Sequence, residues 1–260
     1  MPELLDRVAV VTGAGGVVGT AVAQRFAGEG ARIVLVDEDQ AALGPIREEL
    51  RHPAGSVDSL VTNLTSESQV KALVARILAR FGQIDILVNA MGTAEEPPWD
   101  EPGPAVWERR LRSLTACALC CGAVVPEMRA RGRGRIVNIA ATAGRYRSGY
   151  ARPEGLTGTG VASAATGGGV LALTRELSLE LGPHGVTVNA VVPGWILTER
   201  STREWERMSE RARRDILAEI SLGRPGRPGE VAGAVLFLAS DASSYVSGTA
   251  IDVNGGWWMS

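Results

Sequence analysis

The chain has 260 residues, of which 45% are hydrophobic and 22% are charged, and its formal net charge is −2. This size fits one α/β domain over residues 1–260, and the charge excludes a general attraction to nucleic acid or anionic membranes. No apolar run reaches the roughly 18 residues that a membrane span needs, and the N-terminus does not resemble a signal peptide. We therefore expect a cytoplasmic protein with no nucleic-acid or membrane partner.

Short runs rich in Val and Ile alternate along the chain with longer amphipathic stretches. The runs, in chain order, are RVAVVTG, RIVLVD, SLVTN, DILVNA, GRIVNIA, VTVNAVVPG and GTAIDVNGG. Helical patterns lie between them, for example over 17–30, 66–81 and 105–131. This alternation predicts a doubly wound, Rossmann-type parallel sheet of about seven strands, with helices on both faces. Ligands in such folds bind beyond the carboxyl ends of the strands, so functional residues should follow the strands.

The first predicted strand is followed by TGAGGVVG, residues 12–19, which leads directly into a helix. Glycines let the backbone approach a pyrophosphate, and a helix N-terminus offers free N–H groups and a partial positive charge. This placement predicts a dinucleotide-binding loop. The loop residues assigned to the cofactor are Gly13, Gly15, Gly16, Val18 and Gly19.

The second predicted strand ends at Asp37. A carboxylate at this point can accept hydrogen bonds from the ribose hydroxyls of NAD, and it would repel the 2′-phosphate of NADP. No basic residue stands at Gly16 or Glu38 to receive that phosphate. The sequence therefore predicts NAD as the cofactor, the alternative being that Asp37 is an ordinary solvated acid in a loop.

The three cysteines, Cys117, Cys120 and Cys121, lie in one apolar segment, and the two histidines, His52 and His184, stand far from them and from each other. A metal site would need further ligands near the thiols. We therefore predict no metal site, and we interpret the cysteines as small residues of a core or an interface.

Over nearly its whole length the chain resembles the short-chain dehydrogenases/reductases. The family's glycine pattern matches at Thr12, Gly13 and Gly19, and LVNAMG resembles its fourth-strand motif. PGWILT resembles the loop that usually holds the nicotinamide amide, with Thr198 as the contact, and YVSGTAIDVNGG resembles the last strand. The further cofactor residues that this resemblance implies are Asn63, Leu64, Asn89, Ala90, Gly92, Pro193, Gly194, Ile196 and Thr198.

Two cofactor positions depart from the family pattern. Val17 stands where the middle glycine is expected, which puts a branched side chain near the phosphates. Asn63 replaces an acid that usually meets the adenine amino group. Its amide oxygen can still accept that hydrogen bond, so we expect little loss there.

The catalytic positions depart more strongly. The family uses Asn, Ser, Tyr and Lys side chains, and matching by motif places Ser113 at the Asn position, or Leu114 if the match slips by one residue. The Ser, Tyr and Lys positions are occupied by Ala141, Ser163 and Gly167. The resemblance therefore implies that the inherited proton relay is absent, which would cripple carbonyl reduction by the family route.

The segment between Ala141 and Ser163 spans 22 positions, which is longer than usual in the family. We expect it to bring aromatic and charged side chains to the cleft, with Tyr150 as the first candidate for a new proton donor and Tyr146 as the second. A phenol is the right type of acid, and nearby arginines would favour its ionised form. An ordinary surface loop is the alternative. The charged residues of the segment are Arg145, Arg147, Arg152 and Glu154.

Three functions stay open on this evidence. The first is a divergent NAD-dependent oxidoreductase that acts on a small organic substrate, anionic ones included. The second is a non-redox enzyme on the same scaffold, such as a cyclase, dehydratase or isomerase. The third is a catalytically silent subunit that pairs with an active relative. The resemblance implies a homodimer or homotetramer, or a hetero-oligomer with such a relative, through the helices near 105–131 and 160–182, and Trp257 and Trp258 suggest a second interface.

Overall fold

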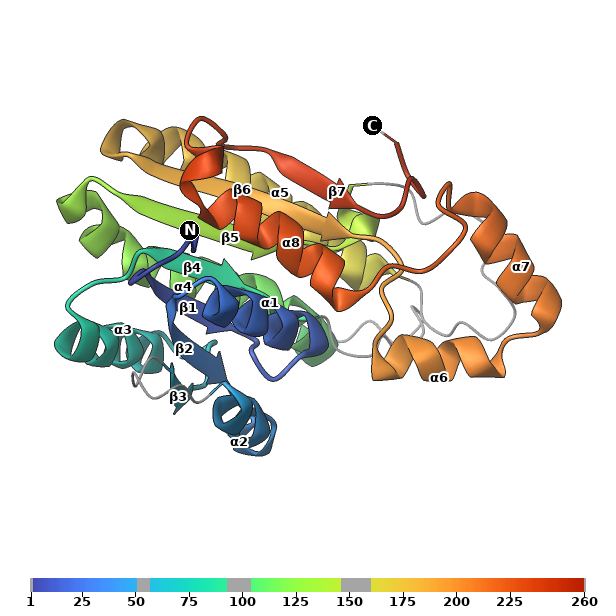
Figure 1. The fold of residues 1–260 in the computed structure, drawn as a ribbon, viewed down its shortest axis with the longest axis horizontal. Coiled ribbons are helices and arrows are strands. Elements are labelled where there is room, and N and C mark those ends of the chain that lie inside the picture. Colours follow the sequence, from blue (N-terminus) through green and yellow to red (C-terminus); the bar gives the residue numbers. More distant parts are fainter. Residues whose placement is uncertain (1, 51–56, 93–103, 146–159, 260) are drawn as a thin grey trace.

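The computed structural model describes residues 2–50, 57–92, 104–145 and 160–259. Within them, seven strands form one sheet in the order β3-β2-β1-β4-β5-β6-β7, and every pairing is parallel (Figure 1). The predicted Rossmann-type sheet is therefore confirmed. The strands are β1 (Val8–Thr12), β2 (Arg32–Asp37), β3 (Val57–Val61), β4 (Ile86–Asn89), β5 (Gly134–Ile139), β6 (Val186–Pro193) and β7 (Ala250–Val253).

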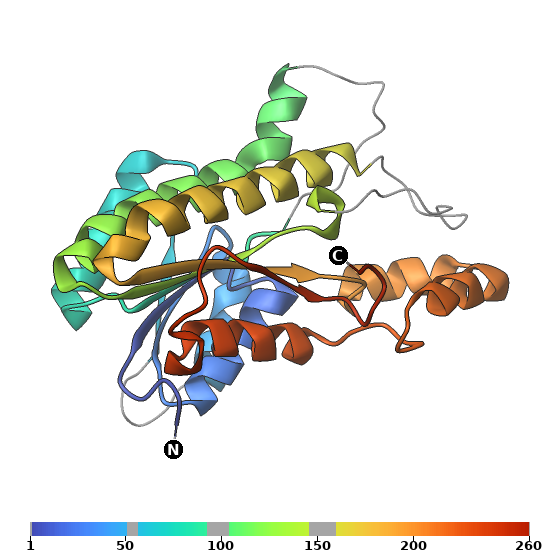
Figure 2. The same cartoon turned by 90° about the horizontal axis from the view of Figure 1, so that it is seen from above.

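Helices cover both faces of the sheet, as Figure 2 shows from above. One face carries α1 (Val17–Gly28), α2 (Gln40–Glu49) and α8 (Pro228–Ala239). The other carries α3 (Glu67–Phe81), α4 (Pro104–Arg131) and α5 (Val161–Leu181). Short 3-10 turns follow β5, α5 and α8, at Thr142–Gly144, Gly182–His184 and Asp241–Ser243.

A hydrophobic core fills each side of the sheet. Alternate residues of a strand point to opposite faces. In β1, Val8 and Val10 join the core under α3, α4 and α5, whereas Ala9 and Val11 join the core under α1, α2 and α8. All four are buried, so the continuous apolar strand sequence reflects a sheet that is covered on both sides.

A third, smaller core lies outside the sheet, where α6 (Glu199–Arg207) and α7 (Glu210–Glu219) extend beyond the carboxyl ends of the strands (Figure 1). Its buried residues, Met208, Ala212, Ile216 and Ile220, pack with three tryptophans, Trp195, Trp205 and Trp257. Trp257 lies edge-on to Trp195, with ring centroids 6.3 Å apart, and its Nε1 donates to Glu219 at 3.0 Å. The structure thus gives Trp257 an intramolecular role in holding this unit to the sheet.

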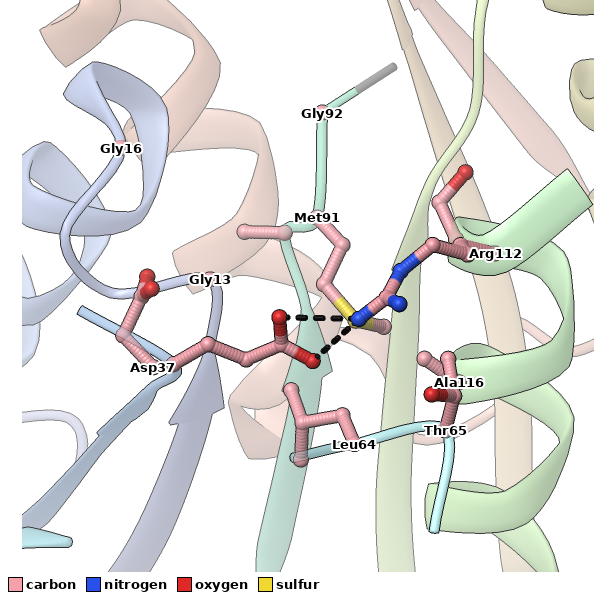
Figure 3. Close-up of a pocket in the computed structure, with 12 residues that line it drawn as sticks. Gly13, Gly16, Asp37, Leu64, Thr65, Met91, Gly92, Arg112 and Ala116 are labelled. Carbon is pink, nitrogen blue, oxygen red and sulfur yellow. Dashed lines mark hydrogen bonds and ion pairs between the residues drawn. The ribbon is translucent and has the colours of Figure 1, made fainter. Parts of the chain in front are cut away.

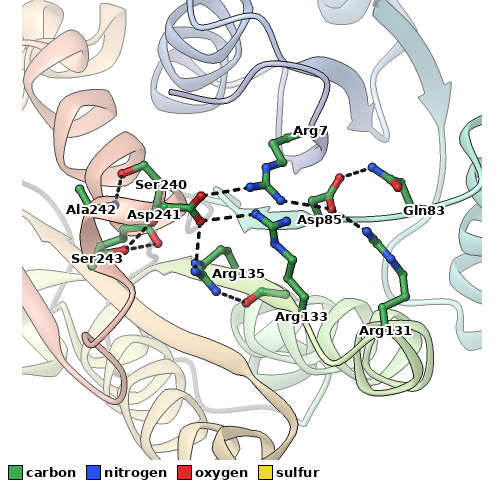
Figure 4. A network of polar contacts seen from close by, with 12 residues as sticks. Arg7, Gln83, Asp85, Arg131, Arg133, Arg135, Ser240, Asp241, Ala242 and Ser243 are labelled. Atoms are coloured by element: carbon green, nitrogen blue, oxygen red, sulfur yellow. Dashed lines mark hydrogen bonds and ion pairs between the residues drawn. The ribbon is translucent and has the colours of Figure 1, made fainter. Parts of the chain in front are cut away.

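Ion pairs join the elements at the opposite, amino edge of the sheet (Figure 4). Asp85 is only 3% exposed, and it accepts hydrogen bonds from the Val8 backbone at 2.8 Å and from Arg131 at 3.1 Å. Asp241, beyond α8, is largely exposed and faces three arginines, Arg7, Arg133 and Arg135. These contacts fasten β1, β5 and α8 together, far from the carboxyl edge.

One stretch within α4, Leu111–Arg131, is long and apolar enough by composition to cross a membrane. The sequence of this stretch is not an unbroken apolar run, because Arg112, Glu127 and Arg129 interrupt it. In the fold it is a core helix. Its buried face against the sheet consists of Ala116, Cys117, Cys120, Cys121, Val124 and Met128.

Candidate active site

Two adjoining cavities lie at the carboxyl edge of the sheet. The first cavity has a volume of about 250 Å³ and the second about 200 Å³, and both are lined by Ala90, Met91, Gly92 and Ser113. The first also has Gly13, Gly16, Asp37, Glu38, Leu64, Thr65, Arg112 and Ala116 as lining residues (Figure 3). The second has Val18, Asn89, Cys117, Ile139, Ala140, Ala141, Thr166, Gly167 and Val170.

At Gly13 and Gly19 the glycine loop approaches neighbouring backbone too closely for side chains. Gly13 has φ 67°, and a Cβ there would lie 2.7 Å from the carbonyl oxygen of Ala90. A Cβ on Gly19 would lie 2.2 Å from the carbonyl oxygen of Gly13. The loop therefore wraps tightly over the end of β4 and turns into α1, whose N-terminal N–H groups suit an anionic ligand.

Val17, at the first position of α1, is 39% exposed. Its side chain lines a separate groove between α1 and α8, together with Thr20 and Pro228. Among the described residues that line the first and second cavities, Val17 does not occur. Val17 therefore contributes to this groove, which Gly15 of the glycine loop also lines.

Asp37 supports the glycine loop as well as lining the first cavity. One carboxylate oxygen accepts a hydrogen bond from the Gly15 backbone N–H at 2.9 Å, and the other accepts from the Asp39 N–H at 3.1 Å. The carboxylate is therefore held in a fixed position at the cavity wall. Each oxygen keeps a further lone pair that could accept from a sugar hydroxyl.

Arg112 of α4 reaches across the first cavity to Glu38, the residue after β2. Its Nη2 lies 2.8 and 2.9 Å from the two carboxylate oxygens of Glu38 (Figure 3). Each side chain is 47% exposed. The pair cannot be read from the sequence, because only the tertiary fold brings residue 112 opposite residue 38.

Asn63 does not line the first cavity, whereas its neighbour Leu64 does and is buried. The amide oxygen of Asn63 accepts hydrogen bonds from the N–H and the hydroxyl of Thr65, at 3.0 and 2.7 Å. An adenine amino group that bound the Asn63 amide oxygen would share it with these two donors of Thr65. Asn63 therefore shapes the turn after β3, and Leu64 supplies the apolar wall.

A chain of buried polar side chains runs beneath the cavities. Thr12 donates to Asn89 at 3.0 Å, Asn89 donates to Asn138 at 2.9 Å, and Asn138 donates to Thr174 at 3.0 Å. The hydroxyl of Thr174 then donates to the Val170 carbonyl at 2.8 Å. Asn89, a predicted cofactor residue at the end of β4, is thus hydrogen-bonded to Thr12 of β1 and Asn138 of β5, and these contacts hold the three strand ends together.

The second cavity is lined by most of the residues that the sequence motifs match to the family's catalytic positions. Ser113 lines it, and its buried Oγ has no hydrogen-bond partner among the residues that the structure describes. Ala141 and Gly167 also line it and carry no polar side-chain group. Ser163 lies one turn before Gly167 on α5 and is half-buried. Leu114, the alternative to Ser113, packs on α5 instead, since a Cβ on Gly169 would lie 2.6 Å from its Cδ2.

Other lining residues of the cavities were not predicted. Ala116 and Cys117 lie three and four positions after Ser113 in α4, and this helical spacing was the signal that could have found them. Hydrogen bonding with Cys121 and burial raise the pKa of Cys117 well above its ordinary value, and burial raises the pKa of Cys120 to about 12. Cys117 and Cys120 are therefore protonated, and all three free thiols are buried in the core.

The loop after β6 is held by its own contacts. The Thr142 hydroxyl donates to the Pro193 carbonyl, Gly194 lies against Asn254, and the buried Ile196 bridges to Gly226. Thr198, the expected contact for the nicotinamide amide, caps α6, and its Oγ1 accepts from the Ser201 N–H at 3.1 Å. Any ligand contact by Thr198 must share this hydroxyl.

The long segment after β5 falls largely outside the described residues, including both candidate proton donors, Tyr146 and Tyr150, and the charged Arg147, Arg152 and Glu154. Arg145 is described, and its predicted place in the cleft is wrong. Its guanidinium donates to the Ala250 carbonyl at 2.8 Å and pairs with Asp252 at 3.4 Å. These acceptors draw Arg145 to β7, at the edge of the sheet.

Comparisons with known proteins agree with this geometry. The family model described as Enoyl-(Acyl carrier protein) reductase matches residues 13–258. The chain is 35% identical over 255 residues to 3-oxoacyl-(acyl-carrier-protein) reductase FabG of Thermotoga maritima, with 98% of each chain covered. It is 36% identical over 254 residues to cis-4-hydroxycyclohexanecarboxylate dehydrogenase of Sinomonas cyclohexanicum, with 97% of this chain and 96% of that relative covered.

The fold matches solved structures equally well. A crystal structure of a short-chain dehydrogenase/reductase from Brucella melitensis, titled glucose/ribitol dehydrogenase, superposes with a TM-score of 0.86 at 31% identity, and 99% of each chain is covered. The family match, the relatives and this structure all span nearly the whole chain. The protein therefore belongs to the short-chain dehydrogenase/reductase family of oxidoreductases, whose members use nicotinamide cofactors.

Proposed function

We propose that the chain is a divergent NAD-dependent oxidoreductase that acts on a small organic substrate, anionic substrates included. The observation that carries the proposal is the meeting of the glycine loop and Asp37 at the first cavity, next to the cavity that contains the catalytic positions. A bound nicotinamide would supply or accept the hydride. The chain's own residues would hold the dinucleotide, exclude water and deliver the proton.

The residues present fit such a cofactor. The glycine loop leaves backbone exposed where a Cβ at Gly13 or Gly19 would collide with neighbouring backbone, and α1 begins directly behind it. The fixed carboxylate of Asp37 suits ribose hydroxyls and disfavours a 2′-phosphate. Leu64 and Ala90 supply apolar walls for a flat ring. These features support NAD over NADP.

We further propose that the proton moves by a relay other than the family's Tyr/Lys pair. Ala141 and Gly167 offer no titratable group, and an alcohol such as Ser163 is a much weaker acid than a phenol. Our candidates remain Tyr150 first and Tyr146 second. The second cavity, which Ala141 and Gly167 line, leaves room for groups that approach from the neighbouring segment.

Calorimetric titration with NADH and NADPH tests the cofactor assignment. We expect NADH to bind and NADPH to bind much more weakly, and the Asp37→Asn variant to narrow the difference, since it removes the charge that opposes the 2′-phosphate. Equal or reversed affinities in the wild type would contradict the role of Asp37. Hydride transfer is then measured as the loss of NADH absorbance with a panel of ketones and keto acids.

Two alternatives are favoured by the apolar surface at Ala141 and Gly167. A non-redox cyclase, dehydratase or isomerase would convert substrate without consuming NADH. A silent subunit would form a stable complex only with a second chain that carries the family's catalytic residues. Product analysis with and without NADH distinguishes the first alternative, and co-expression with such a relative distinguishes the second.

We also propose a cytoplasmic homodimer or homotetramer, with α4 and α5 as the contact, because these two helices lie side by side on one face of the sheet. Several apolar side chains of this layer remain exposed or partly exposed, including Leu179, which is 73% exposed. Light scattering at micromolar concentration should give at least twice the mass of one chain. A monomer would contradict this assembly.

A further inference from the structure

The ion pair between Arg112 and Glu38 joins two lining residues of the first cavity. Glu38 follows β2 on one side of the cavity and Arg112 projects from α4 on the other, and Met91 and Leu64 line the same cavity. One guanidinium nitrogen lies within hydrogen-bond distance of both carboxylate oxygens, at 2.8 and 2.9 Å. A ligand that fills the first cavity therefore lies against the pair.

The fold does not depend on this contact. Both side chains are 47% exposed, and an ion pair in that setting contributes little to stability because water and salt screen it. The elements that it joins are held by the sheet and the buried core, in which Val34 and Val36 of β2 and Cys117 of α4 take part. The pair is therefore free to open without loss of structure.

We propose that Glu38 and Arg112 form a clasp that closes over the adenosine half of the bound dinucleotide and sets its rate of dissociation. This inference rests on the proposed function, because it takes the first cavity as the adenosine site. A planar guanidinium stacks well on the face of a ring system, and Arg112 lines the cavity beside Ala116 and opposite Leu64. Arg112 is the member of the clasp that touches the ligand, and Glu38 positions it.

The clasp also keeps the guanidinium of Arg112 from binding the 2′-phosphate of NADP. Asp37 lies next to Glu38 in the chain and lines the same cavity, so a freed guanidinium could offer a cation to a 2′-phosphate. While the guanidinium of Arg112 is paired with Glu38, it is not available to bind the 2′-phosphate. Loss of Glu38 and loss of Arg112 should therefore have opposite effects on NADPH, although both weaken the clasp.

Stopped-flow dissociation of NADH, followed by its fluorescence during displacement with excess NAD⁺, tests the proposal. We expect Arg112→Ala and Glu38→Gln each to speed dissociation by about tenfold, as suits the loss of a charge-assisted contact. The double variant should be no faster than the worse single variant, because both changes open the same clasp. Added KCl should speed dissociation in the wild type and have little effect in Arg112→Ala.

Lys71→Ala is the matched control, since Lys71 and Glu67 form an exposed ion pair on α3, away from the cavities. It should dissociate NADH at the wild-type rate. Glu38→Gln should bind NADPH more tightly than the wild type, and Arg112→Ala should not. A charge-reversed pair, Arg112→Glu with Glu38→Arg, should restore the ion pair without restoring slow dissociation of NADH, because the guanidinium no longer projects from α4.

The outcomes separate the two proposals. Dissociation rates within twofold of the wild type in both single variants, or additive effects in the double variant, would overturn the clasp while leaving NAD binding intact. Failure of the wild type to bind NADH would overturn the proposed function and the clasp with it. Thermal unfolding of each variant verifies that an altered rate comes from a folded protein.

Discussion

Gly167 of α5 lies in direct contact with Ala141 at the end of β5. A Cβ on Gly167 would stand 2.9 Å from the carbonyl oxygen of Ala141 and 3.0 Å from its Cβ. The next glycine of the helix, Gly168, has room by comparison, since its Cβ would meet nothing nearer than 3.6 Å. Two adjacent glycines on one helix therefore tolerate substitution very differently.

Gly167→Ala is expected to lower stability by about 1 kcal/mol, because the cost of overpacking exceeds the usual gain from replacing glycine in a helix. Gly168→Ala is the matched control and should raise stability by about 0.5 kcal/mol, since it keeps the helix gain without the collision. Urea denaturation of both variants checks this. Equal stabilities for the two would show that α5 is not pressed against β5.

The same contact bears on attempts to restore the family's catalytic pair. Gly167→Lys must displace the Ala141 backbone before its side chain can extend into the second cavity. Ser163→Tyr with Gly167→Lys should therefore fail to give efficient carbonyl reduction.

Tyr150→Phe should lower turnover by about 10²–10⁴ while NADH affinity stays nearly unchanged, because a proton donor is lost and the dinucleotide site is not. Steady-state kinetics with calorimetric titration of NADH measures both quantities. Tyr245→Phe is the control, since Tyr245 is fully exposed in the turn before β7. Full activity in the Tyr146→Phe and Tyr150→Phe double variant would exclude both loop phenols as donors.

Asp85→Ala should lower the free energy of unfolding by about 3–5 kcal/mol, because it leaves the Val8 N–H without its acceptor and removes the buried partner of Arg131. Asp241→Ala, which removes an exposed carboxylate from the same edge, should cost no more than about 1 kcal/mol. Chemical denaturation compares the two. Similar losses would mean that burial does not govern this network.

Glu230→Gln should destabilise the protein at neutral pH and lose its effect in acid. Hydrogen bonds from Arg224 and from the Arg227 backbone lower the pKa of Glu230 from 4.5 to about 2. A depressed pKa contributes stability above the unfolded value and loses it as pH falls toward the folded value, here from about 4.5 to about 2. Thermal midpoints of both proteins, measured from pH 7 down to pH 3, should therefore converge. A constant difference across this range would contradict the assignment.

The sequence was sufficient for the sheet and the glycine loop because each depends on local pattern. Apolar runs of strand length mark β1 to β7, and TGAGGVVG lies between a strand and a helix, so its place at the carboxyl edge follows from the fold class. Asp37 was found for the same reason, as the last residue of a strand. Such predictions need only neighbouring residues.

Other features depend on partners that are distant in the chain. Arg112 meets a residue 74 positions away, and Arg145 is drawn to a carbonyl 105 positions away. Asn63 and Thr198 show a different limit, since their side chains satisfy nearby backbone groups, a use that competes with ligand binding and is invisible in a motif. The Gly167 contact likewise needs the distance between α5 and β5, which no single segment encodes.

The hydrogen bonds from Thr12 through Asn89 and Asn138 to Thr174 all run in one direction, and the last donor meets a backbone carbonyl. A carbonyl cannot donate, and turning either amide alone would set two oxygens or two N–H groups of Asn89 and Asn138 against each other, so the two amides are oriented together. The four residues therefore depend on one another, because a substitution at one leaves its neighbour without a hydrogen-bond partner. Sequence drift at any of them should be seen only together with compensating change at the next, whereas the apolar residues around them can vary singly.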